Sequence, residues 1–192
     1  MEDLKYEYPY NIFLKLDISP RSDRIEVLYE LMNMFLNETE KQVILGKYKD
    51  LITYREIARK IGISDYKVMS ISNKALFIIS SKANLIKNTN LFYWYKKLSL
   101  AYNSFLKNPT VDNQRYLAIC RENFPMADLM VSDLNLPTSL NNALYRANIR
   151  YVSELLSMNE EQLMGLRSIG APSISKINEY LRPYGYRIKK GR

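Results

Sequence analysis

The 192-residue sequence contains no histidine, a single cysteine (Cys120) and only six glycines. One cysteine excludes an internal disulfide and any zinc site built from clustered cysteines. The absence of histidine removes the side chain that most often acts as a general base or metal ligand near neutral pH. The sequence has neither the GxGxxG nor the GxxxxGK[ST] phosphate-binding pattern. We therefore predict that the protein is not an enzyme and binds no metal or cofactor.

Long apolar runs are missing as well. No stretch approaches the roughly 18 residues that span a membrane, and the first ten residues lack the pattern of a secretory signal. We expect a cytoplasmic protein without a membrane partner. Its composition, 47% hydrophobic and 25% charged, is that of a globular protein. The sequence has room for two small cores, because single domains usually have roughly 100 to 150 residues.

Basic residues are concentrated in the middle of the sequence. Residues 53–107 contain ten Lys and Arg but only two Asp and Glu, a surplus equal to the net charge of +8 of the whole protein. Such a surplus is typical of a surface that binds a polyanion such as nucleic acid. A solvated basic surface without a polyanion partner is the alternative interpretation.

Helix-forming residues dominate the sequence, and no segment alternates polar and apolar residues for more than a few positions. This pattern predicts an all-α fold. Apolar residues at helical spacing indicate a first long helix over residues 21–35. Asn37 starts the next helix, because Glu40 follows at the spacing of a capping box.

A helix-turn-helix pattern follows at residues 53–81. Thr53 and Glu56 form a second capping box, and the helix that they start ends at Gly62, which permits a left-handed turn. Ser64 then caps a helix over residues 65–81. Helical spacing predicts that this helix buries Val68, Ile71, Ala75 and Ile78 and exposes Tyr66, Lys67, Ser70, Asn73 and Lys74.

Residues 36–81 resemble the fourth conserved region of bacterial sigma factors, the promoter-binding helix-turn-helix. The matching residues include Leu36, Val43, Ile44, Tyr48, Thr53, Tyr54, Glu56, Ile57, Ala58, the run Ile61-Gly62-Ile63-Ser64, Val68, Ala75 and Leu76. The resemblance implies that Tyr66, Lys67, Ser70, Asn73 and Lys74 face the groove of double-stranded DNA. It also implies that Arg55 and Lys60 lie near phosphates.

The sequence departs from the sigma-factor family in its recognition helix and in the length of the segment before the helix-turn-helix. Ser70 and Ser72 occupy positions where arginines often stand in that family. The 36 residues before Asn37 are too few for the helical region that grips the polymerase. We therefore expect either a transcription regulator built on the same module or a protein that docks on RNA polymerase or a sigma factor.

The segment over residues 85–130 is predicted to be a helical connector. Five apolar or aromatic residues follow a spacing of four and three along its first helix: Leu91, Tyr95, Leu98, Tyr102 and Phe105. Packing of this helix on the helix-turn-helix core is the favoured interpretation, and dimerisation is the alternative, which leaves the oligomeric state open. Aromatic residues between lysines can also stack on nucleic-acid bases.

Short helices with tight breaks follow from Val131 and indicate a compact domain of the helix-hairpin-helix type over residues 131–192. The run Ser168-Ile169-Gly170 precedes the last of these helices. A turn before a helix N-terminus exposes backbone N–H groups and the positive end of the helix dipole, which suits a phosphate.

Residues 132–188 resemble the C-terminal domain of the bacterial RNA polymerase alpha subunit. Matching positions include Leu134, Leu136, Asn142, Leu144, Ile149, Leu155, Leu156, Glu161, Leu163, Ile169, Gly170, Ser173, Ile174, Ile177, Leu181 and Gly185. The resemblance implies minor-groove contacts from Asn142, Gly170 and Ser173. Ser139 and Pro172 replace the family's arginine and lysine, and Lys176 replaces an acidic residue. Arg146 and Arg150 offer basic side chains near the same end of the domain.

These patterns together predict a DNA-binding transcription regulator with a sigma-like domain over residues 1–84, the connector and an alpha-subunit-like domain. The alternative is an interaction module that binds RNA polymerase or a sigma factor without reading DNA. An enzyme that uses Glu160 and Glu161 is disfavoured, because adjacent residues on a helix point about 100° apart.

Overall fold

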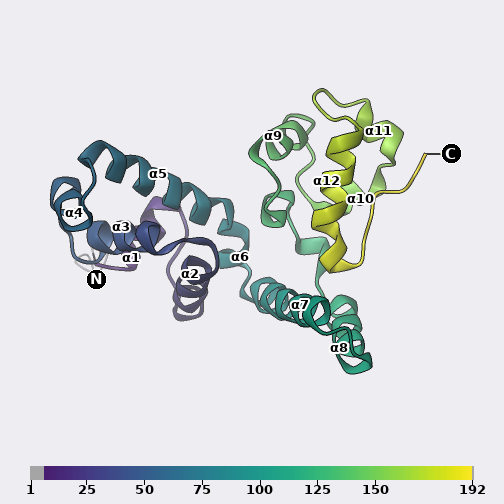
Figure 1. Ribbon diagram of the computed structural model, residues 1–192, viewed down its shortest axis with the longest axis horizontal. Helices are drawn as coiled ribbons and strands as arrows, with labels where there is room; N and C mark the ends of the chain where they lie inside the picture. Colours follow the sequence, from purple (N-terminus) through teal and green to yellow (C-terminus); the bar gives the residue numbers. More distant parts are fainter. Residues whose placement is uncertain (1–6, 192) are drawn as a thin grey trace. The chain divides into compact units, whose positions relative to one another are not determined.

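The computed structural model describes residues 7–191 and confirms the predicted all-α fold (Figure 1). Within that range, the only paired extended segments are two isolated bridges, Met130 with Tyr151 and Asn159 with Lys189. No helix in the same range is long and apolar enough to cross a membrane. The protein forms two compact units that divide between Thr89 and Asn90. The first six residues of the predicted sigma-like domain lie outside the described range, and the three-part division stays a prediction.

The first unit is built around α5, which packs on α2, α3 and α4. Its helices follow one another along the sequence with short connections (Figure 1). They are α1 (Tyr10–Lys15), α2 (Ser22–Phe35), α3 (Glu38–Tyr48), α4 (Tyr54–Ile61), α5 (Asp65–Ser81) and α6 (Ala83–Lys87).

The predicted helix starts at Asn37, Thr53 and Ser64 are confirmed by side-chain hydrogen bonds. The Asn37 side chain accepts from the Glu40 N–H at 2.9 Å, and the Glu40 carboxylate accepts from the Asn37 N–H at 3.0 Å. Thr53 and Glu56 form the same reciprocal pair at the start of α4. The Ser64 hydroxyl caps α5 by accepting from the Lys67 N–H at 3.3 Å. Each cap satisfies a backbone donor that the helix itself leaves unpaired.

The core under the helix-turn-helix consists of Val43, Ile57, Ala58 and Val68, with Ile63 packed against it at the turn. Helices α3 and α4 approach closely at Gly46. A Cβ atom added there would lie 3.0 Å from Cγ1 of Ile57. The small residue at this position therefore permits the contact between the two helices.

The predicted buried stripe of α5 is confirmed at Val68 and Ala75, while Ile71, which packs against the core, and Ile78 are only half-buried. The fully buried residues are Val68, Ser72, Ala75 and Ile79. Ser72 is buried with a partner, because the Tyr54 hydroxyl lies 3.3 Å from its Oγ atom. Apolar spacing alone favours the two isoleucines and misses a serine whose hydroxyl is hydrogen-bonded across the helix interface.

The second unit contains a long helix, a shorter helix and then the short helices of the C-terminal region. Helix α12 lies beside α11 in this unit (Figure 1). The elements are α7 (Thr89–Lys107), α8 (Val111–Glu122), η2 (Met126–Asp128), η3 (Val131–Leu134), α9 (Thr138–Arg146), α10 (Val152–Ser157), α11 (Glu160–Met164), α12 (Ala171–Leu181) and η4 (Arg182–Tyr184).

Helix α7 differs from its predicted role as a helix packed on the helix-turn-helix core. From Asn90 onward it belongs to the second unit. Leu98 is buried, and Tyr95 and Tyr102 lie half-buried on the same face. These three residues line a pocket with side chains of η3, α12 and η4. These three seam residues therefore face the C-terminal part of the second unit.

Helix α8 is joined to the C-terminal segment through Arg121. The Arg121 guanidinium donates to the carbonyl oxygens of Pro183 and Arg182, each at 2.9 Å. Its Cδ atom would lie 3.1 Å from a Cβ atom at Gly185, where φ is +84°. Gly185 thus combines a left-handed backbone with a close contact, and both disfavour any larger residue.

Candidate nucleic-acid interface

The turn between α4 and α5 has the geometry that the sequence predicts. Gly62 ends α4 in the left-handed conformation with φ of 72°, and its N–H donates to the Ala58 carbonyl at 2.9 Å. The next N–H, of Ile63, donates to the same carbonyl at 3.1 Å. These bonds satisfy the free carbonyl at the end of α4 and direct the backbone into α5.

Helix α4 is fixed at its start by Glu56. The Thr53 N–H and the Thr53 hydroxyl each donate to the Glu56 carboxylate at 2.7 Å. These bonds chiefly lower the pKa of the Glu56 carboxyl from its ordinary value of 4.5; burial acts in the opposite direction, and the charges of Arg59 and Lys60 add smaller lowering effects. The carboxylate is therefore ionised near neutral pH and holds the start of the helix that carries the basic side chains.

The basic residues predicted for this site lie on its surface. Arg55 and Lys60 on α4 and Lys67 in the first turn of α5 are all exposed. Arg59 on α4 is exposed as well, although the sequence patterns do not select it as a site residue. Exposed cations on both helices of the pair are what phosphate contacts require.

Lys74 differs from the other predicted cations because it has a partner within the protein. Its Nζ atom lies 2.9 Å from Oε1 of Glu40, whose side chain is only 6% exposed. Lys74 itself remains 67% exposed. The ion pair connects α5 to the start of α3, so part of the charge assigned to DNA contact is used to hold α5 in place.

The outer face of α5 is more apolar than a phosphate-binding face requires. Ser70 and Asn73 are exposed, as predicted, and so is Tyr66 at 74%. Phe77, two helical turns past Ser70, is 64% exposed, and Met69 is 40% exposed. Exposed large apolar residues on one helix face are typical of contact with another macromolecule.

In the second unit, α9 presents two of the predicted site residues. Asn142 and Arg146 are four residues apart and both exposed, so they share one face of the helix. Ser139, in the position where the alpha-subunit family has arginine, is exposed three residues before Asn142. This face therefore carries a single cation, Arg146, on the residues that the structure describes for α9.

The side chain of Arg150 is held in place by contacts with Tyr145. Its Nη1 atom donates to the Tyr145 carbonyl at 2.6 Å, and its guanidinium carbon lies 3.6 Å from the centre of the Tyr145 ring. Tyr145 is 65% exposed, so the stacked pair lies on the surface. Sequence reasoning missed this pair because the two residues meet only through the turn that follows α9.

The start of α12 differs from the predicted glycine turn. Gly170 has an extended backbone with φ of −129°, whereas Ser168 takes the left-handed conformation with φ of 69°. Gly170 is therefore the N-cap of α12 without any conformational need for glycine. Pro172 in the first turn has no N–H, so this N-terminus offers one donor fewer to a phosphate. Ser173 is half-buried there.

The C-terminal part of the sequence matches a known family. The family model for the C-terminal domain of the bacterial RNA polymerase alpha chain matches residues 121–183. The DNA-directed RNA polymerase subunit alpha of Rubrobacter xylanophilus is 36% identical over 62 residues, which cover 32% of this protein and 20% of that subunit. The same subunit of Thermotoga petrophila is 31% identical over 84 residues, which cover 43% and 24%. No solved structure matches significantly.

The match begins earlier than the alpha-like domain that the sequence patterns predict from residue 131. It starts at Arg121, the residue whose guanidinium binds the Pro183 and Arg182 carbonyls at the other end of the matched segment. Hydrogen bonds thus connect the two ends of the matched segment. The matched stretches span only about a fifth to a quarter of the length of the alpha subunits. Residues 121–183 match the C-terminal domain of the bacterial RNA polymerase alpha subunit.

Proposed function

We propose that the protein is a DNA-binding transcription regulator that engages promoter DNA, RNA polymerase or both. The helix-turn-helix of the first unit is the proposed contact with double-stranded DNA. The alpha-like C-terminal domain is the proposed second contact, with DNA or with polymerase. No reaction is proposed.

The observation that carries the proposal is the basic surface of α4 and α5. Arg55, Lys60 and Lys67 are exposed on two helices joined by a turn with φ of 72° at Gly62. In helix-turn-helix proteins the second helix enters the major groove and the first crosses the backbone. The resemblance of residues 36–81 to the promoter-binding region of sigma factors supports this assignment.

The matched relatives support the transcription setting. They are subunits of DNA-directed RNA polymerase, and residues 121–183 match the C-terminal domain of that subunit. On α9 and α12, the proposed contacts are Asn142, Arg146, Gly170 and Ser173. Ser139 and Pro172 weaken a minor-groove role, so we assign the main DNA contact to the first unit.

The test is duplex binding by the full-length protein over a range of salt concentrations. We expect Arg55→Glu and Lys67→Glu each to weaken binding and to lower the slope of log K against log salt by about 0.9 per lost phosphate contact. Lys15→Glu, an exposed charge reversal on α1, is the matched control and should leave the slope nearly unchanged. Lys74 is unsuitable for this test because its substitution also removes the partner of Glu40.

The second candidate is the interaction module that docks on RNA polymerase or a sigma factor without reading DNA. The exposed Tyr66, Met69 and Phe77 on α5 favour it. If Arg55→Glu and Lys67→Glu leave duplex binding unchanged at low salt, this candidate replaces the first. Tyr66→Ala and Phe77→Ala should then reduce co-purification with polymerase.

A further inference from the structure

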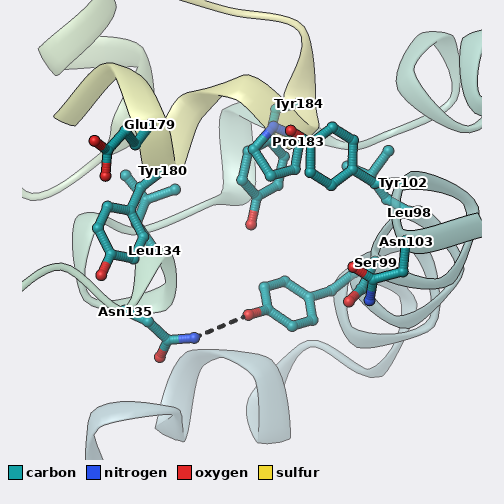
Figure 2. Close-up of a pocket in the computed structure, with 11 residues that line it drawn as sticks. Leu98, Ser99, Tyr102, Asn103, Leu134, Asn135, Glu179, Tyr180, Pro183 and Tyr184 are labelled. Atoms are coloured by element: carbon teal, nitrogen blue, oxygen red, sulfur yellow. Dashed lines mark hydrogen bonds between the residues drawn. The ribbon is translucent and has the colours of Figure 1, made fainter. Parts of the chain in front are cut away.

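The second unit contains a pocket whose walls are rich in tyrosine (Figure 2). Helix α7 supplies Leu98, Ser99, Asn103 and two of the tyrosines. Helix α12 and η4 supply Glu179, Pro183 and the other two tyrosines, and Leu134 and Asn135 complete the lining. The four tyrosines are Tyr95, Tyr102, Tyr180 and Tyr184. In the view of Figure 2, Glu179 and Tyr180 lie across the central space from Ser99 and Asn103.

The described lining of the pocket contains one carboxylate and no basic side chain, although the protein as a whole carries a charge of +8. Among the described residues, Glu179 is the only charged one in its lining, and no lysine or arginine contributes to the walls. The faces of the tyrosine rings are themselves the negative ends of quadrupoles. A cation that enters would therefore meet no like charge on the pocket wall.

A second carboxylate lies close to two of the tyrosines. Asp133 is fully buried, and it accepts a hydrogen bond from the Met130 N–H at 3.0 Å. Burial and then the charge of Asp133 raise the pKa of Tyr95 to about 12, although the hydrogen bond from Asn135 opposes the shift. Burial, Tyr95 and Asp133 also raise the pKa of Tyr184. Burial, the larger cause of both shifts, opposes any charge, whereas the negative charge of Asp133 opposes a phenolate and attracts a cation.

At the edge of the pocket, a lysine already lies beside a carboxylate and a tyrosine ring. The Lys176 Nζ atom lies 2.7 Å from Oε2 of Glu179 and 5.6 Å from the centre of the Tyr180 ring. Both charged side chains are about half exposed, at 45% and 51%. An exposed ion pair of this kind is weak, so a better-placed cation can compete for Glu179 and Tyr180.

We propose that this pocket binds the guanidinium or alkylammonium group of an organic cation, with the tyrosine rings as its walls and Glu179 as its counter-charge. The cavity of about 260 Å³ is slightly smaller than the roughly 300–1,000 Å³ usual for ligand pockets. It therefore suits one cationic head group rather than a nucleotide. The group belongs either to a free small molecule or to an arginine side chain of a partner protein. Neither source depends on DNA binding by the first unit.

The test is a titration of the full-length protein followed by amide chemical shifts in NMR spectra. The probes are tetramethylammonium chloride, N-acetyl-arginine amide and an acetylated Gly-Arg-Gly peptide, each compared with sodium chloride at equal ionic strength. We expect saturable shifts around Tyr102 and Tyr180. Binding of the peptide at least tenfold more tightly than the amide would assign the site to a partner's arginine, and equal affinities would assign it to a free cation.

Matched variants separate the pocket from general charge effects. Glu179→Gln should weaken probe binding about fivefold, and Lys176→Met should strengthen it, because Glu179 loses its internal competitor. Glu122→Gln, which removes an exposed carboxylate on α8 outside the pocket, should leave the affinity unchanged. Tyr102→Phe should retain binding and Tyr102→Leu should lose it, because only the former keeps an aromatic face. No saturable shift with any probe would overturn the proposal, as would equal affinities of wild type, Glu179→Gln and Tyr102→Leu.

Discussion

Lys74 on the exposed side of α5 reaches Glu40 at the start of α3, with Nζ and Oε1 2.9 Å apart. The second carboxylate oxygen of Glu40 accepts from the Asn37 N–H at 3.0 Å. One buried carboxylate therefore caps α3 and anchors the helix that carries the proposed DNA contacts. Burial acts to raise the pKa of Glu40, but the hydrogen bonds from Lys74 and Asn37 and the charge of Lys74 lower it overall from its ordinary value of 4.5.

Glu40→Gln should reduce the stability of the first unit in a pH-dependent manner. Because the folded-state pKa of Glu40 is lowered, its contribution is complete above about pH 5 and is lost as the pH falls through the folded-state pKa. We expect a loss of about 1 to 2 kcal/mol at pH 7 that shrinks as the pH falls through the lowered folded-state pKa of Glu40. Denaturant unfolding followed by circular dichroism at several pH values measures the difference.

The control for this prediction is Glu38→Gln. Glu38 pairs with Lys41 at 2.7 Å, but its side chain is 82% exposed, so its pair should contribute little. A loss of stability in Glu40→Gln that stays constant from neutral to strongly acidic pH would show that the substitution acts through packing rather than through the ion pair.

Gly62→Ala should destabilise the first unit by about 1 kcal/mol through backbone strain alone. A Cβ atom at this position meets nothing within 4 Å, but φ is +72°. Gly62→Asn should reduce the stability less than Gly62→Ala does, because asparagine tolerates the left-handed conformation better than alanine. Thermal unfolding of the three proteins tests this order. Equal unfolding midpoints for the Gly62→Ala and Gly62→Asn variants would show that the loss of stability does not come from the positive φ angle.

Ser139→Arg should strengthen DNA binding if α9 faces a DNA groove. The test uses the full-length protein with Arg55→Glu and Lys67→Glu in place, so that the first unit contributes little. We expect a gain of about tenfold from one added groove contact. Ser153→Arg, which adds the same charge at an exposed position on α10, is the control. Equal gains from both substitutions would indicate a general effect of charge.

Leu98→Ala should open a cavity beside the tyrosine pocket, because Leu98 is only 1% exposed. We expect a loss of about 2 to 5 kcal/mol from the second unit. Trp94, the single tryptophan, lies one helical turn away on α7 and reports this transition by fluorescence. The midpoint should be independent of protein concentration. A midpoint that rises with concentration in the wild type and loses this dependence in the variant would favour the dimer interpretation of the seam.

The sequence predicted those parts of the fold that depend on neighbouring residues. The pairs Asn37–Glu40 and Thr53–Glu56, the cap at Ser64 and the left-handed Gly62 all appear as predicted. Each involves groups within about four positions of one another, so the backbone geometry of a helix end alone brings them together. The same locality explains why the exposure of Tyr66, Lys67, Ser70 and Asn73 could be predicted from helical spacing.

Contacts across long sequence separations were decided by the tertiary structure. The Tyr54 hydroxyl is the hydrogen-bond partner of the buried Ser72, and the Lys74 ammonium pairs with the Glu40 carboxylate. The tyrosine pocket joins α7 to α12 and η4, which lie far along the sequence from it. The amino-acid sequence by itself thus determined the helices and their ends, because these depend on local hydrogen bonds. Which side chains meet between helices depends on how the helices pack, and only the tertiary structure fixes that.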